Sequence, residues 1–305
     1  MNNINGYNIS PMDWMQLSLQ TDQANADLVS EVLMGLGSVS ITYLDTNDDA
    51  IYEPPVGETP LWQHVTINAL FDMGVDQGHI SKTLLDLCDT KILNFEVLAD
   101  RVWEDECKKD FHAMQFGNRI WICPSWETAA NLPDDAIVID MDPGLAFGTG
   151  THQTTDLCLQ HLDNYPPQDL VVIDYGSGTG ILAIAAAKLG ARSVVAIDND
   201  PQAVLATRAN VADNHCENII AIHHTDDNEA LEKCDLLIAN ILANPLIELE
   251  SAFADMVKEG GSIVLSGILE EQLEMILEVY QAHFKCLEVQ QKDEWCRVSG
   301  TRKNK

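Results

Sequence analysis

Basic residues are scarce in this chain of 305 residues. Lys and Arg together number 17 against 48 Asp and Glu, which leaves a formal net charge of −31 at pH 7. A surface of this charge repels the phosphates of nucleic acid, so we expect no direct nucleic acid partner. It attracts basic macromolecules instead, and a basic protein is the candidate partner. A generally acidic proteome, for example one adapted to salt, would explain the charge equally well.

Long apolar runs and paired cysteines are also absent. No stretch approaches the roughly 20 apolar residues of a membrane span. The opening residues, MNNINGYNIS, lack the basic and apolar regions of a signal peptide. The eight cysteines form no C-x-x-C pair and are typical of reduced core residues. His223 and His224 are neighbours that would face opposite ways in a strand, so we expect no metal site. From the lack of a membrane span and of a signal peptide we expect no membrane contact and a cytoplasmic protein.

A glycine-rich segment organises the rest of the chain. The sequence over 171–181, VVIDYGSGTGI, is an apolar β-branched run that ends on Asp174 and on three glycines, Gly176, Gly178 and Gly180. An alanine-rich stretch follows. We predict a buried parallel strand, a glycine turn and a helix. Glycine allows positive φ and a close approach of ligand to backbone, and the next helix offers free N–H groups.

Two kinds of nucleotide ligand compete for such a turn. The dinucleotide fingerprint G-x-G-x-x-G needs glycine where Ile181 stands, whereas the spacing here is G-x-G-x-G. A carboxylate at the strand end, Asp174, would repel a pyrophosphate but suits a ligand that carries an ammonium and a sulfonium group. S-adenosylmethionine is such a ligand. We therefore expect Asp174, Gly176 and Gly178 to line its site, with an ordinary tight turn as the alternative.

A second carboxylate strengthens this interpretation. The segment SVVAIDND predicts another apolar strand that ends at Asp198, 22 residues after Gly176. In a doubly wound fold this is the position of the acid that binds the ribose hydroxyls. We predict that Asp198 binds the cofactor in this way. The alternative is a helix cap at Asp198 or Asp200.

The first hundred residues predict a small α+β unit. WMQLSL alternates like a half-buried strand, ADLVSEVLMGLG has helical spacing, and SVSITYL and HVTINALF are further strand candidates. A second helix is expected from Gln77 to about Leu87, followed by a strand near 95–98. The predicted order is βαββαβ, with the helices on one face of an antiparallel sheet. We find no cluster of catalytic residue types here, so the unit is either a recognition module or a structural or dimerising appendage.

The domain boundaries follow from composition. We predict one domain over 1–101, a connector over 102–131 and a second domain over 132–305. The connector is polar and aromatic and shows no sustained helix or strand period. We expect it to let the two domains change their mutual orientation.

A second glycine-rich segment, AIVIDMDPGLAFGTGTHQTT, comes just before the nucleotide strand. It predicts a strand over 137–139, a mobile loop with three glycines, and a helix capped by Thr151. A loop in this place can fold over a ligand, and Phe147 and Thr155 are its expected contacts. A hairpin with ordinary turn glycines is the alternative.

A third segment, CDLLIANILANPLIEL, predicts a strand that delivers Asn240 at its carboxyl end, where ligands bind in open α/β sheets. An amide suits amine methylation, because its carbonyl oxygen accepts a hydrogen bond from the nucleophile without adding charge. We predict that Asn240 is catalytic and contacts the cofactor. Capping of the next helix is the alternative.

The tail predicts the end of the sheet. GGSIVLSGI reads as a fifth strand, LEEQLEMILEVYQAHF as a helix, and LEVQQKDEWCRVSGTR as a hairpin. The predicted fold class is therefore α/β, a Rossmann-like doubly wound domain preceded by the small α+β domain.

These motifs carry a family resemblance. DYGSGTGILAIAAAKLGA with AIDNDPQAV is similar to motifs one and two of the seven-stranded methyltransferases that use S-adenosylmethionine. The set formed by DPGLAFGTGTHQTT, that motif, ANILANPL and the closing EWCRVSG resembles the PrmA family, which methylates protein eleven of the large ribosomal subunit. The match is dense over the C-terminal half and extends through WICPSW. The N-terminal domain matches mainly in the order of its elements.

The resemblance implies several further properties. A ferredoxin-like N-terminal domain would hold the ribosomal protein, and a flexible linker would let the enzyme trimethylate the α-amino group and lysine ε-amino groups. The family's cofactor contacts map onto Thr155, Gly176, Asp198 and Asn240. We expect a monomer that needs S-adenosylmethionine and no metal.

The predicted reaction is a direct transfer of methyl to a neutral amine. An α-amino group with a pKa of about 7.7 to 8.0 is partly neutral near pH 7, whereas lysine, at about 10.4, must be helped by desolvation. The residues identify no dedicated base, and His152 is one candidate. Two rival functions remain open: methylation of a small molecule or another protein, and a binding module that escorts a basic ribosomal protein.

Overall fold

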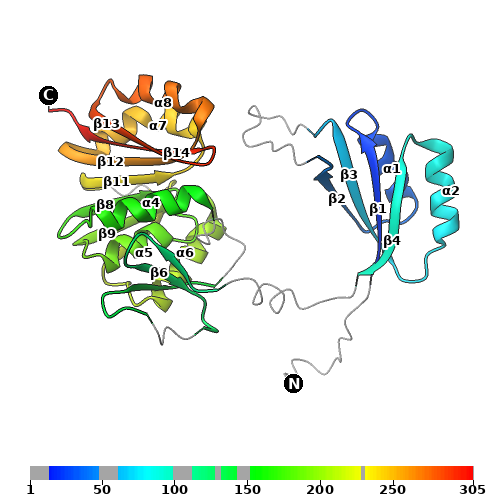
Figure 1. The fold of residues 1–305 in the computed structure, drawn as a ribbon, viewed down its shortest axis with the longest axis horizontal. Helices are drawn as coiled ribbons and strands as arrows, with labels where there is room; N and C mark the ends of the chain where they lie inside the picture. Colours follow the sequence, from blue (N-terminus) through cyan, green and yellow to red (C-terminus); the bar gives the residue numbers. More distant parts are fainter. Residues whose placement is uncertain are drawn as a thin grey trace. The chain divides into compact units, whose positions relative to one another are not determined.

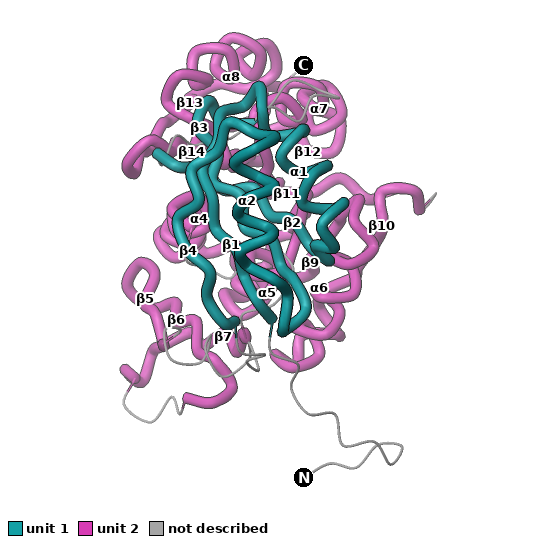
Figure 2. The backbone as a smooth tube through the Cα atoms, turned by 90° about the vertical axis from the view of Figure 1, so that its right-hand side faces the viewer, with its two compact units in different colours: residues 1–106 teal, residues 107–305 magenta. Residues whose placement is uncertain are grey.

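The chain folds into two compact units, Met1–Glu106 and Cys107–Lys305, in the computed structural model (Figure 2). The described residues are 14–47, 61–98, 112–127, 132–142, 152–227 and 231–304. None of the helices in these ranges has both the length and the apolar character needed to cross a bilayer.

Unit 1 has the element order that the sequence predicts. Its elements, which Figure 1 labels, are β1 (Trp14–Asp22), α1 (Ala26–Gly35), β2 (Ser40–Asp45), β3 (His64–Asp72), α2 (Gln77–Leu87) and β4 (Lys91–Leu98). The strands form an antiparallel sheet in the order β2-β3-β1-β4. The observed helix α2 matches the predicted span from Gln77 to about Leu87.

One face of the unit 1 sheet is apolar, because side chains of alternate residues point to the same face. Met15, Leu17 and Leu19 of β1 are buried, and the residues between them are partly exposed. The buried positions of α1 and α2, among them Leu33 and Leu84, pack into the same core. Both helices therefore cover one face of this sheet, as the sequence predicts.

Unit 2 begins with three short strands and continues as alternating strands and helices. Its elements are β5 (Met114–Phe116), β6 (Ile120–Cys123), β7 (Ile137–Asp140), α4 (Gln153–Asn164), β8 (Val171–Tyr175), α5 (Ile181–Lys188), β9 (Ser193–Asp198), α6 (Pro201–Asp213), β10 (Ile220–His224), β11 (Cys234–Asn240), α7 (Ala243–Met256), β12 (Val257–Leu269), η1 (Glu270–Gln272), α8 (Leu273–Tyr280), β13 (Phe284–Lys292) and β14 (Trp295–Arg302).

The main sheet of unit 2 contains, among the described residues, seven strands in the order β10-β9-β8-β11-β12-β14-β13. The first five are parallel, and β14 and β13 add as an antiparallel hairpin. The chain proceeds outward from β8 to β9 and β10 and then returns to the other side of β8 as β11. Ligands of open α/β sheets bind at the carboxyl ends of the strands at such a reversal of order.

Both faces of this sheet are covered by helices. The residues of β8 and β11 alternate between two cores: Val172 and Ile238 pack with α4, α5 and α6, whereas Ile173 and Leu237 pack with α7 and α8. A strand buried on both faces has the continuous apolar composition that the sequence shows over 171–173. The predicted parallel strands and the closing hairpin are present.

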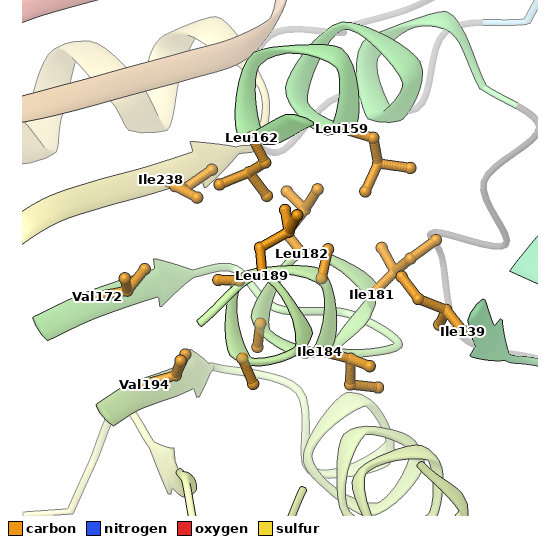
Figure 3. Packing of buried hydrophobic residues seen from close by; sticks show 14 of the residues in the cluster. Ile139, Leu159, Leu162, Val172, Ile181, Leu182, Ile184, Leu189, Val194 and Ile238 are labelled. Atoms are coloured by element: carbon orange, nitrogen blue, oxygen red, sulfur yellow. The ribbon is translucent and has the colours of Figure 1, made fainter. Parts of the chain in front are cut away.

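Helix α5 is the centre of the first core (Figure 3). Every residue from Ile181 to Ala187 is buried, and the alanines let the helix lie close to the strands. Figure 3 shows Leu159 and Leu162 of α4 on one side of α5 and Val172 of β8 on another. Full burial of a leucine or isoleucine side chain contributes about 1.5 to 3 kcal/mol, so this core holds the glycine turn before α5 firmly in place.

The predicted connector over 102–131 differs from the structure, because it contains β5 and β6. These two strands pair with each other, and β6 pairs in parallel with β7. Asp163 of α4 anchors their turn, accepting hydrogen bonds from the backbone N–H of Asn118 at 2.6 Å and from Nε of Arg119 at 2.8 Å. Local periodicity missed them because each strand is short and because β6 also depends on β7, which is more distant in the sequence.

Candidate functional site

The glycine turn connects β8 to α5 at the carboxyl edge of the sheet. Gly176, Gly178 and Gly180 have φ values of 77°, 56° and 81°, in the left-handed region that glycine tolerates best. Gly176 is also sterically required, because a Cβ at this position would lie 2.2 Å from Cγ2 of Ile241. The turn thus packs directly against the segment that follows β11.

Neighbouring elements hold the turn through its backbone. Ile197 of β9 accepts hydrogen bonds from the N–H groups of Gly176 and Ser177. On the other side, α6 donates two side-chain hydrogen bonds to the turn's carbonyls, from Thr207 to Gly178 at 2.9 Å and from Asn210 to Thr179 at 2.8 Å. Neither of these two α6 residues is singled out by the sequence motifs; the signal that could have found them is their spacing of three, which places both on one helix face.

Asp198 lies at the end of β9, beside the turn, and is 8% exposed. Its Oδ2 accepts a hydrogen bond from the N–H of Gly178 at 2.8 Å, and its Oδ1 accepts one from Asp200 at 2.9 Å. The cap of α6 is Asp200, whose side chain accepts from Gln202. Each carboxylate oxygen can accept more than one hydrogen bond, so Asp198 retains acceptor capacity for a ligand.

Asp174 is the most buried carboxylate of the site, at 1% exposure. Its Oδ2 accepts a hydrogen bond from the N–H of Ala183 at 2.9 Å. Its Oδ1 is buried without a hydrogen-bond partner among the described residues. Burial raises the pKa of Asp174 to about 7; the bond from Ala183 opposes this rise and the charge of Asp198 adds to it. A buried carboxylate with one unmatched oxygen fits a cationic ligand.

Asn240 and Thr155 meet although they are 85 residues apart. Asn240 ends β11, and its Nδ2 lies 3.4 Å from Oγ1 of Thr155, a fully buried residue in the first turn of α4. The helix after β11 has Leu242 at its N-cap with no side-chain cap bond, so Asn240 does not cap it. The contact engages the amide nitrogen of Asn240, and the carbonyl oxygen of the same side chain can still accept a hydrogen bond.

The start of α4 differs from the prediction, which placed Thr151 at the cap. The N-cap is His152, whose side chain accepts from the N–H of Thr154. Its ring also lies edge-on against Trp295 of β14, with centroids 4.9 Å apart. One turn further, Asp156 accepts a hydrogen bond from Lys292 of β13. The β13–β14 hairpin therefore fixes the helix start that carries Thr155. Phe147 and the glycine-rich loop around it lie outside the described residues.

Four of the predicted site residues lie together at the carboxyl edge of the main sheet of unit 2. Asp174 lies one residue before the end of β8, Asp198 ends the neighbouring strand β9, and Asn240 ends β11 on the other side of β8. Gly176 follows β8 directly, between them. In the ranges that the structure describes, no group of three or more His, Cys, Asp or Glu could hold a metal ion.

The arrangement fits S-adenosylmethionine as a bound group. Two carboxylates, a hydroxyl and an amide surround the end of β8, and the hydrogen bonds of Asp174 and Asp198 in the described chain come from backbone N–H groups. The unmatched oxygen of Asp174 suits the positive charges of this ligand, and a pyrophosphate would be repelled. Fold and site together define a protein of the nucleotide-binding α/β class.

Comparison with known proteins identifies the family within this class. The crystal structure of a ribosomal protein L11 methylase from Lactobacillus delbrueckii subsp. bulgaricus superposes with a TM-score of 0.57 at 33% identity, over 64% of this chain and all of that one. The family described as ribosomal protein L11 methyltransferase (PrmA) matches residues 13–303. The chain belongs to this family.

Curated relatives agree over nearly the full length. A ribosomal protein L11 methyltransferase of Shewanella pealeana is 47% identical over 96% of this chain and 100% of that protein. One of Mannheimia succiniciproducens is 44% identical over 95% of this chain and 99% of that protein. The resemblance noted in the sequence is thus confirmed at the level of the family.

Proposed function

We propose that this chain is an S-adenosylmethionine-dependent protein methyltransferase that modifies the α-amino group and lysine ε-amino groups of ribosomal protein L11. Membership of the PrmA family and relatives of that name at 44% and 47% identity support the activity and the substrate. The observation that carries the proposal is the convergence of Asp174, Asp198 and the Asn240–Thr155 pair on the glycine turn.

The cofactor is assigned to the carboxyl edge around β8. Asp198 binds the ribose hydroxyls, Asp174 faces the cationic part, and the backbone of Gly176 and Gly178 lines the floor. Thr155 and Asn240 close the side nearest the acceptor amine, and Phe147 remains a predicted contact. When bound, S-adenosylmethionine supplies an electrophilic methyl group on a positively charged sulfur.

Asn240 orients the incoming amine in this proposal. Its Nδ2 is engaged with Thr155, so its carbonyl oxygen accepts a hydrogen bond from an N–H of the amine. This bond directs the amine lone pair and adds no charge that would stabilise the ammonium form. Proximity and orientation then supply the rate increase, after the amine has lost its proton.

The proton of the amine passes to water rather than to a protein base. His152 was the candidate base, but its Nδ1 bonds to the hydroxyl of Thr154 at 2.8 Å and caps α4. Burial lowers the pKa of His152, and Glu294 opposes this shift. The ring is therefore largely neutral at pH 7, with the nitrogen that caps the helix already occupied.

The two units have different roles in this proposal. Unit 1, a ferredoxin-like domain in the βαββαβ order of its elements, recognises the ribosomal protein, and the chain from 132 onward carries out the transfer. The net charge of −31 favours a basic substrate and disfavours nucleic acid. Because the substrate is a ribosomal protein, we propose that the reaction takes place in the cytoplasm. We also propose that the enzyme acts as a monomer.

The decisive experiment measures the product. The purified chain is incubated with tritiated S-adenosylmethionine and a ribosomal protein extract, and the labelled bands are identified. In a second experiment, the mass of purified L11 is measured by intact-mass spectrometry before and after reaction. We expect label in the L11 band and mass increases in steps of one methyl group, mapped to amines. Label spread over many bands, or in none, contradicts the specific assignment. Failure to bind S-adenosylmethionine in calorimetry would favour the escort function.

A further inference from the structure

The turn that follows β10 is joined to the end of β9. His224, the last residue of β10, lies beside Asp198 in the parallel register. The turn closes on itself, because the N–H of His224 donates to Oδ2 of Asp227 at 2.8 Å and the N–H of Asp227 donates to the carbonyl of His224 at 2.9 Å. The N–H of Thr225 donates to the carbonyl of Asp198 at 3.0 Å.

The ring of His224 adds a second connection. Its Nε2 lies 2.9 Å from the carbonyl oxygen of Asn199, and its Nδ1 lies 3.1 Å from the backbone nitrogen of Asp226. A carbonyl can only accept and a backbone N–H can only donate. Nδ1 therefore accepts from the N–H of Asp226, and Nε2 carries a hydrogen that it donates to Asn199.

The position of the ring decides what it can affect. If Asp174 and Asn240 mark the sulfonium end of the cofactor and Asp198 marks the ribose, the purine extends further along the sheet toward β10. The loops after β9 and β10 border that region, since they follow the next two carboxyl ends in the strand order. His224 joins these loops through the residue directly after Asp198.

We propose that His224 is a positioning residue for the adenosine part of the cofactor, acting through the hydrogen bond from Nε2 to Asn199. This inference rests on the proposed function. The ring does not itself touch the ligand; it holds the residue after Asp198 at a fixed distance from the turn after β10.

The expected effect is moderate because other bonds remain. Asp198 keeps its own contacts with Gly178 and Asp200, and Thr225 still donates to its carbonyl. Loss of the single bond to Asn199 removes about one ordinary hydrogen bond, so affinity for the cofactor should fall about fivefold rather than disappear.

Two amide variants distinguish the roles of the two ring nitrogens of His224. In His224→Gln the side-chain amide nitrogen reaches the Nε2 position and can donate to Asn199. In His224→Asn the side-chain oxygen takes the Nδ1 position and can accept from Asp226, but the side chain does not extend to Asn199. The proposal predicts that His224→Gln binds like the wild type and that His224→Asn resembles His224→Ala.

The test is titration calorimetry of the full chain with S-adenosylhomocysteine. We expect Kd to rise about fivefold for His224→Ala and His224→Asn, and less than about twofold for His224→Gln. With L11, the KM for S-adenosylmethionine should rise to the same extent while kcat at saturation is unchanged, a split that general damage to the fold would not produce. His215→Asn is the matched control, because His215 is exposed, precedes β10, and has φ 57°, which asparagine tolerates.

Two results would overturn the assignment: wild-type affinity in both His224→Ala and His224→Asn, or an affinity in His224→Gln as low as in His224→Ala. Thermal unfolding of the ligand-free variants shows whether they are folded, and the glutamine variant keeps the test valid if alanine destabilises the turn. A wild-type chain that does not bind S-adenosylhomocysteine would instead contradict the proposed function, and the His224 assignment with it.

Discussion

The carboxylate of Asp198 and the backbone N–H of Gly178 lie 2.8 Å apart in a hydrogen bond that joins the end of β9 to the glycine turn after β8. The side chain proposed to bind the ribose thus also holds the loop proposed to form the cofactor floor. A single carboxylate couples the two halves of the site, so changes at this position act on both.

We predict that Asp198→Ala weakens the binding of S-adenosylmethionine by about 1.5 to 3 kcal/mol, the usual value for hydrogen bonds to a charged group. Titration calorimetry measures the change. Asp200→Asn is the control, because Asp200 caps α6 and asparagine is an equally good N-cap. An unchanged Kd in Asp198→Ala would show that the ribose assignment is wrong.

Asp174 should make the stability of the ligand-free chain depend on pH. Burial raises its pKa from 3.8 to about 7 in the folded chain, so between these values the folded state binds more protons than the unfolded state. The contribution of Asp174 to the free energy of unfolding is therefore present at low pH and is lost as the pH rises from about 4 to 7.

Asp174→Asn should remove this dependence, since an amide does not titrate. Urea unfolding at about pH 5 and about pH 8 is expected to show that the wild type loses stability relative to Asp174→Asn as the pH rises. Asp213→Asn, at an exposed carboxylate at the end of α6, serves as the control. A constant difference between wild type and Asp174→Asn across this range would contradict the prediction.

Gly176→Ala should destabilise unit 2 and abolish tight cofactor binding. The new Cβ would lie 2.2 Å from Ile241 and would occupy a backbone with φ 77°. Overpacking costs about 1 to 3 kcal/mol, and the left-handed conformation adds about 1 to 2 kcal/mol for alanine. Gly260→Ala isolates the second effect, because Gly260 has φ 78° and a Cβ added there would meet no atom within 4 Å.

Chemical denaturation measures both glycine variants. We expect Gly176→Ala to lose more stability than Gly260→Ala, and Ile241→Ala to restore part of the difference when combined with Gly176→Ala. Equal losses in the two single variants would mean that Ile241 yields to the new methyl group at little cost.

Asn240→Ala should lower kcat about a hundredfold while leaving the Kd of S-adenosylmethionine within a few fold, since misplacing a reacting group has a cost of this order. Thr155→Val should have a smaller effect of the same kind, because it removes the oxygen that Nδ2 of Asn240 contacts. Thr155→Ser keeps that oxygen and is the control. Single-turnover methylation of L11 at saturating cofactor is the measurement, and an unaltered rate in Asn240→Ala would exclude the orienting role.

Much of the fold could be predicted because its signals are local. The apolar run before Asp174 and the alanines after Gly180 specify a strand, a turn and a buried helix from composition and glycine spacing alone. The same holds for βαββαβ in unit 1, where alternation in β1 and β3 marks the face that α1 and α2 cover. The strands β5 and β6 were not predicted, because Asp163, which anchors their turn, lies 45 residues after Asn118 in the chain.

The sequence by itself determined the residue types of the site and the strand ends at which they stand, since glycine spacing and apolar runs act over a few neighbouring residues. Only the tertiary structure decided which groups meet: Asp198 with Gly178, Asn240 with Thr155, and His152 rather than Thr151 at the start of α4. These contacts depend on strand order and on helix packing, which bring together positions that are far apart along the chain.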